Sequence, residues 1–78
     1  MSPLEGASPA LAAVIRRLRE ERGVTQEDLA HEAGVTTGTL SKIERGLANP
    51  SWTTVERIAR ALSVSLGELG AAVDRLST

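Results

Sequence analysis

The sequence contains no cysteine, tyrosine or phenylalanine, one tryptophan (Trp52) and one histidine (His31). Without cysteine the chain has no disulfide and no thiolate ligand for zinc, haem or a redox centre. One histidine cannot build a metal site alone, so we expect neither a metal nor another cofactor. A chain without cysteine also fits a reducing cytoplasm, where we expect the protein to act.

Long apolar runs are also absent. No stretch approaches the roughly 20 apolar residues of a membrane-spanning helix, and the N-terminal MSPLEGASP lacks the basic and apolar parts of a secretion signal. A length of 78 residues suits one domain. We therefore predict a protein without membrane contact, with a flexible tail over residues 1–7 and one domain over residues 8–78.

An excess of positive charge is missing as well, because the formal net charge is −1 and the sequence pI is about 5.8. Nucleic-acid-binding domains are usually basic, so the overall charge argues mildly against such a partner. The distribution of the charges then becomes important. No acidic residue lies on the side of Lys42 and Arg45 in the helix predicted over residues 37–45. Glu27, Asp28 and Glu32 lie on the preceding helix, predicted over residues 26–33.

Apolar residues recur at helical spacing along most of the chain, as in Leu11, Val14, Ile15 and Leu18. Residues that favour helix N-caps stand before the apolar segments, and glycines follow three of them. The N-cap residues are Ser8, Thr25, Thr36, Ser51 and Ser65, and the glycines are Gly23, Gly34 and Gly46. These signals predict an all-α fold with helices over 9–22, 26–33, 37–45, 52–62 and from 66 onward.

The second and third predicted helices are joined by a very short turn. Tight packing of such a pair needs a small residue in the first helix, a turn residue that tolerates positive φ, and apolar residues in the second helix. Ala30, Gly34, Leu40 and Ile43 meet these needs. The pattern predicts a helix-turn-helix, in which the second helix enters the major groove of DNA.

A helical wheel at about 100° per residue shows what the third helix presents to its surroundings. Leu40 and Ile43 point inward; Gly38, Ser41, Lys42 and Arg45 point away from them, and Thr37 and Thr39 lie on the flanks. Small residues let a backbone approach base edges, threonine methyls suit thymine methyls, and a lysine reaches guanine O6 or N7. The free N–H groups after Thr36 can donate hydrogen bonds to a phosphate.

The segment TQEDLAHEAGVTTGTLSKIERGLANPSWTTVERIARALSVSLGEL resembles the Xre/Cro family of helix-turn-helix regulators, which includes the lambdoid phage repressors. The residues that carry the resemblance are Gln26, Leu29, Ala30, Ala33, Gly34, Val35, Ser41, Ile43, Glu44, Gly46, Pro50, Ser51, Ile58 and Ala59. It implies a compact five-helix, lambda-repressor-like domain. It also implies that Thr37, Gly38, Thr39 and Lys42 read bases beside Ser41, and that Gln26 and Arg45 contact phosphates. A partly buried ion pair between Arg19 and Glu44 is implied too.

Together these patterns predict a bacterial transcription regulator, a repressor or autoregulator, that binds a pseudo-palindromic site on double-stranded DNA as a homodimer. No small-molecule ligand is expected. The alternative is an antitoxin or another protein-interaction module on the same fold. Nothing in the sequence assembles a nucleophile with its base, so we do not expect an enzyme.

Two features of the sequence leave more than one interpretation open. Trp52 could pack in the core, contact the DNA backbone or contact a partner subunit. Val73 and Leu76 continue the apolar stripe of the fifth helix toward its C-terminal end. They lie beyond the residue near which the compact domain of the resembling family usually ends. This end of the chain is therefore a candidate dimer interface.

Overall fold

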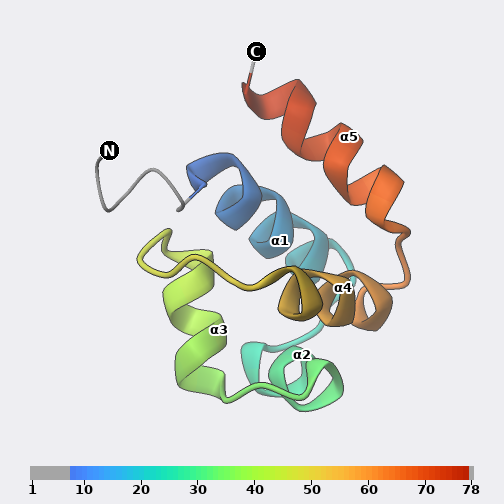
Figure 1. Ribbon diagram of the computed structural model, residues 1–78. Helices are drawn as coiled ribbons and strands as arrows, with labels where there is room; N and C mark the ends of the chain where they lie inside the picture. The colour runs from blue at the N-terminus through green and yellow to red at the C-terminus, as the bar shows by residue number, and fades with distance from the viewer. Residues whose placement is uncertain (1–7, 78) are drawn as a thin grey trace.

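The computed structural model describes residues 8–77, and within that range the chain forms five α-helices and no strand (Figure 1). The helices are α1 (Pro9–Glu21), α2 (Gln26–Ala33), α3 (Thr37–Glu44), α4 (Trp52–Ala61) and α5 (Leu66–Ser77). The predicted all-α class is therefore confirmed. The tail predicted over residues 1–7 lies outside the described residues.

The predicted N-cap residues begin the helices. The side-chain oxygens of Ser8, Thr25, Thr36 and Ser51 each accept a hydrogen bond from the backbone N–H three residues later. Each of these bonds satisfies one of the N–H groups that the first turn of a helix leaves unpaired. The four polar residues thus fix where α1, α2, α3 and α4 begin.

Ser65, the N-cap residue predicted for α5, forms a capping box with Glu68. Ser65 Oγ accepts from the backbone N–H of Glu68 at 3.0 Å, and Glu68 Oε1 accepts from the backbone N–H of Ser65 at 2.9 Å. The bonds from Ser65 lower the pKa of the Glu68 carboxyl. The carboxylate form is therefore the one that caps this helix.

Three helices, α1, α3 and α4, end one residue earlier than predicted. In each, a residue with positive φ follows two positions after the last helical residue: Gly23 at 66°, Gly46 at 73° and Ser63 at 60°. Glycine adopts this conformation without steric cost, whereas a residue with a Cβ is destabilised by roughly 1 kcal/mol. The chain therefore leaves α4 through a strained serine, which the sequence did not indicate.

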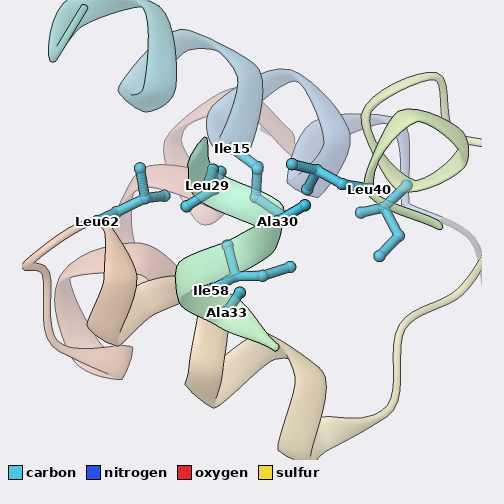
Figure 2. Packing of buried hydrophobic residues seen from close by; sticks show 8 residues of the cluster. Ile15, Leu29, Ala30, Ala33, Leu40, Ile58 and Leu62 are labelled. Carbon is cyan, nitrogen blue, oxygen red and sulfur yellow. The ribbon is translucent and has the colours of Figure 1, made fainter. Parts of the chain in front are cut away.

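Aliphatic side chains fill the interior. The larger cluster joins α1, α2, α3 and α4, and its members include Ile15, Leu29, Ala30, Ala33, Leu40, Ile58 and Leu62 (Figure 2). A second cluster, formed by Val14, Ala59, Leu69 and Ala72, attaches α5 to α1 and α4. The alanines of α2 leave room for neighbouring helices to approach closely, so a small domain builds a dense core without aromatic residues.

The packing of the helices leaves one side of α3 open. α2 packs against both α3 and α4, while α1 packs against α3 and α5. Figure 1 shows α3 at the edge of the molecule, with its outer side not covered by another helix in that view. The inner side of α3 is thus held by two helices while the outer side meets solvent.

Trp52 at the start of α4 is 68% exposed, so it is not a core residue. His31 is exposed, as expected for a polar residue on the outer side of α2. In the part of the chain that the structure describes, no helix combines the length and apolarity needed to cross a bilayer.

Candidate nucleic-acid interface

The connection between α2 and α3 is a tight turn centred on Gly34. Gly34 has φ 73° and ψ 31°, in the left-handed region. The backbone N–H of Val35 donates to Ala30 O at 3.0 Å, and the N–H of Gly34 donates to His31 O at 3.2 Å. These bonds close the end of α2 in the pattern typical of a C-terminal glycine. The chain can then begin α3 at once, from the cap at Thr36.

The outer side of α3 carries most of the residues predicted to contact DNA. Leu40 and Ile43 are buried, at 0% and 2% exposure, and hold the inner side. Exposed on the other side are Thr36, Thr37, Gly38, Thr39, Lys42 and Arg45, with Ser41 half-buried beside them. We call these seven residues the α3 face. The helical wheel drawn from the sequence placed the inward residues correctly.

The glycine in the first turn of α3 is not required by the packing of the protein. Gly38 has a helical φ, and the nearest atom that a Cβ built there would meet is Thr36 Oγ1, at 4.0 Å. An alanine would therefore fit in the isolated protein. The missing side chain leaves the backbone of α3 accessible from outside.

Two hydroxyl groups are linked at the start of α3. Thr36 Oγ1 accepts from the backbone N–H of Thr39 at 3.0 Å and donates to Thr39 Oγ1 at 2.8 Å. This contact between the two side chains was not predicted. The spacing of an N-cap residue and the third helical residue was the signal that could have indicated it.

Two charged residues far apart in the sequence, Arg19 and Glu44, lie together between α1 and α3. Arg19 Nε donates to Glu44 Oε2 at 2.8 Å, and Arg19 Nη2 donates to Glu44 Oε1 at 3.1 Å. Arg19 Nη1 donates to Val24 O at 2.9 Å. The side chains are 13% and 2% exposed, respectively. The hydrogen bonds to Glu44 raise the pKa of the Arg19 guanidinium, so this fork remains charged.

Gln26, the first residue of α2, joins the same network. Its Nε2 donates to Glu44 Oε1 at 3.0 Å. Glu44 therefore connects α3 to α1 and to α2 at once. The sequence placed Gln26 among the phosphate contacts but did not indicate this bond, because it depends on how α2 packs against α3. With one N–H held by Glu44, the orientation of the Gln26 amide is fixed.

The structure brings Gln26 next to the α3 face. A shallow hollow at the surface is lined by Gln26, Thr25 and Glu27 of the start of α2, by Thr37 of α3 and by Arg19. The N-terminal ends of α2 and α3 thus lie side by side. Two of the predicted contact residues, Gln26 and Thr37, border one surface although they come from different helices.

The positive groups of the α3 face differ in their surroundings. Arg45 Nε donates to Ser41 O at 3.3 Å, within the last turn of its own helix. Lys42 is exposed, and its ammonium group makes no hydrogen bond or ion pair with any residue in the described range 8–77. On α1, by contrast, Arg16 and Arg17 are paired with Glu20 and Glu21 at 3.4 and 3.7 Å. Lys42 is thus the cation of this surface whose donors are all available.

The described residues hold no cluster of three or more histidine, cysteine, aspartate or glutamate side chains that could bind a metal ion. The α3 face is instead a surface of hydroxyls, a glycine and two cations. Such a surface can donate hydrogen bonds and approach a polyanion closely.

Comparison with known proteins places this geometry among regulators. The sequence profile of the helix-turn-helix family matches residues 15–69. An HTH-type transcriptional regulator of Methanothermobacter thermautotrophicus is 49% identical over 49 residues, which cover 63% of this chain and 71% of that protein. The immunity repressor of Bacillus phage phi105 is 38% identical over 55 residues, covering 70% of this chain and 38% of the repressor.

The fold matches a solved regulator too. The clp gene regulator ClgR of Corynebacterium glutamicum superposes with a TM-score of 0.84 at 30% identity, and the match covers 90% of this chain and 91% of that one. The five-helix arrangement is therefore shared over nearly the whole length of both chains.

Proposed function

Because this chain belongs to the helix-turn-helix family of DNA-binding transcription regulators, of the Xre/Cro type, we propose that it reads a specific operator with the α3 face. In this proposal α3 enters the major groove of double-stranded DNA. One observation carries it: α3 is held firmly on its inner side, through Leu40, Ile43 and Glu44, while its outer side is uncovered.

The residues of the α3 face have different roles in this proposal. Thr37, Gly38, Thr39 and Lys42 lie nearest the base edges, with Ser41 beside them. Lys42 determines specificity most strongly, because its free ammonium group suits guanine O6 and N7. Its exposure and its lack of partners in the described residues support this role.

Three other residues hold the DNA backbone in this proposal. Gln26 and the N–H groups after Thr36 stand at neighbouring helix N-termini, where anions are favoured. Arg45 lies at the other end of α3 and reaches a phosphate when it leaves Ser41 O. Contacts at both ends of the helix would fix its position along the groove without reading sequence.

The weakly acidic net charge is compatible with this function because the α3 face itself carries two cations and no acid. The exposed acids of α2, Glu27, Asp28 and Glu32, lie on another helix, and of these Glu27 borders the hollow beside Thr37. Few phosphate contacts imply weak non-specific binding. Affinity would then depend strongly on the base contacts.

We also propose that the protein acts as a homodimer on a pseudo-palindromic operator, with half-sites roughly 34 Å apart. A groove between α1, the start of α4 and α5 is lined by Leu11, Trp52, Val55, Leu69 and Val73 among others. Trp52 is largely exposed at its edge, and Leu76 is 49% exposed farther along α5. A second copy of the chain would cover this apolar surface.

A double substitution tests the DNA-binding role of the α3 face. Lys42→Ala with Arg45→Ala removes two positive charges from it, and Arg57→Ala with Arg60→Ala removes two from the exposed side of α4 as a matched control. We expect the first variant to lose operator binding and to fold normally, and the second to bind. Equal binding by both variants would favour the alternative, a protein-interaction module that uses the apolar groove.

The salt dependence separates the two positive residues. The slope of log affinity against log salt is negative. If Arg45 contacts a phosphate, Arg45→Ala makes this slope less steep by about 0.9 per subunit. Lys42→Ala changes the preferred base at one position of each half-site. If Lys42→Ala and Arg45→Ala both change only this slope and leave the preferred bases unchanged, Lys42 does not read a base.

A further inference from the structure

The hydroxyl pair at the start of α3 has a direction. Thr36 Oγ1 accepts the backbone N–H of Thr39 and donates its own proton to Thr39 Oγ1, at 2.8 Å. A hydroxyl carries one proton and can also accept. Because Thr39 Oγ1 accepts from Thr36, the hydroxyl proton of Thr39 is not used in this bond and can be donated to another group.

Both threonines are exposed, and both belong to the first turn of α3 or its cap. The chain of donors runs from the Thr39 backbone N–H to Thr36 Oγ1 and from there to Thr39 Oγ1. Each bond in such a chain polarises the next and makes its last hydroxyl a stronger donor. The last hydroxyl is that of Thr39, on the α3 face.

From this geometry we propose that Thr36 orients the Thr39 hydroxyl as an outward donor, so that Thr39 selects a hydrogen-bond acceptor on a base edge. The inference rests on the proposed function, because it assumes that the α3 face lies in the major groove. Guanine, adenine and thymine each present an acceptor there, whereas cytosine presents only its N4 amino donor. Cytosine offers no acceptor for this proton and is therefore the base that this position disfavours.

Thr36 is a positioning residue that accepts from the backbone N–H of Thr39 and donates to Thr39 Oγ1. These two functions can be separated by substitution. Aspartate is at least as good an N-cap as threonine. In Thr36→Asp, a carboxylate oxygen still accepts the backbone N–H of Thr39, but the ionised side chain has no proton to donate to Thr39 Oγ1. The Thr39 hydroxyl would then turn inward to donate to that oxygen. Thr36→Ser keeps the hydroxyl and serves as the conservative variant.

α4 supplies a matched control with the same chemistry. Ser51 Oγ accepts from the backbone N–H of Thr54 at 3.1 Å, and the two side-chain oxygens lie 2.9 Å apart. This pair starts a different helix and is not part of the α3 face. Ser51→Asp and Thr54→Val thus reproduce the local changes in helix capping without touching the proposed contact.

An operator half-site is first obtained by selecting bound duplexes from a random pool. The experiment then measures dissociation constants on duplexes that carry each of the four base pairs in turn at every position of this half-site. For the wild-type protein we expect one position at which cytosine weakens binding about fivefold or more. Thr39→Val and Thr36→Asp should both reduce that penalty to about twofold or less, and the double variant should do no more than either. The penalty is the ratio of dissociation constants within each variant, so a general loss of affinity from the added carboxylate does not affect it. Thr39→Ser, Thr36→Ser, Ser51→Asp and Thr54→Val should leave it in place.

The outcomes separate this inference from the proposed function. If the wild type prefers particular bases but Thr39→Val changes none of those preferences, Thr39 is not a base contact. If Thr39→Val removes the cytosine penalty and Thr36→Asp retains it, Thr36 does not set the direction of the hydroxyl; either result overturns the inference alone. A wild-type protein with no base preference at any position would overturn the proposed function as well. Melting temperatures equal to the wild type within about 4 °C show that each variant compared is folded.

Discussion

Removal of the Glu44 carboxylate should destabilise the whole domain, because this one group connects α3 to α1 and α2. Glu44→Ala takes two hydrogen bonds from Arg19 and one from Gln26. The Arg19 side chain is only 13% exposed, so its charge would be left with little water around it. Breaking a buried ion pair in this way costs about 3 to 5 kcal/mol.

That loss is large compared with the total stability of a small domain. A chain of 78 residues is expected to have a free energy of unfolding of about 4 to 12 kcal/mol. Since 1 kcal/mol shifts the melting temperature of such a domain by about 4 to 8 °C, Glu44→Ala should melt at least about 12 °C below the wild type. Circular dichroism during thermal and urea unfolding measures the change.

An exposed ion pair provides the control. Arg16 Nε and Glu20 Oε2 are 3.4 Å apart within α1, with both side chains more than half exposed. Glu20→Ala should therefore cost only about 0.3 to 0.5 kcal/mol. A loss of less than about 1 kcal/mol in Glu44→Ala would refute the reasoning, because it would show that α3 is held without the pair.

Three further substitutions test other parts of the account. Gly38→Ala should raise the free energy of unfolding by up to about 1 kcal/mol, because a Cβ fits there, yet weaken operator binding; unchanged affinity would mean that the glycine is incidental. Ser63→Gly should stabilise the protein by up to about 1 kcal/mol in urea unfolding by relieving the positive φ of 60°, and an unchanged urea midpoint would argue against strain there. Glu68→Gln should lower the melting temperature at neutral pH, and this difference should shrink as the pH falls below 4.5. The stabilisation from the lowered pKa of Glu68 is complete above its ordinary value of 4.5 and is lost as the pH falls through the folded value. A melting difference that persists in acid would contradict that cause.

The sequence predicted the fold because its signals are local. Caps such as Thr36 and Ser51, and glycines such as Gly34, act within one turn of the chain, so their effect can be worked out from neighbouring residues. The inward positions of Leu40 and Ile43 followed from helical periodicity. These features also fix the α3 face, which the sequence therefore indicated before the structure was known.

What the sequence did not indicate depends on packing between segments. The bond from Gln26 to Glu44 joins residues 18 positions apart, and no spacing rule connects them. Trp52 lies at a helix start where core and surface positions look alike, and only the packing of α4 shows that it is exposed. The strain at Ser63 was hidden because serine carries no turn signal comparable to that of glycine.

We propose that the α3 face reads DNA sequence as part of a two-fold symmetric dimer. Selection of bound sites from a random pool of duplexes, at moderate salt and with the wild-type protein, measures this reading. We expect enrichment of one motif with two inverted half-sites about one helical turn apart, and loss of that enrichment in the variant with Lys42→Ala and Arg45→Ala. A pool that shows no enriched motif with the wild-type protein would contradict it.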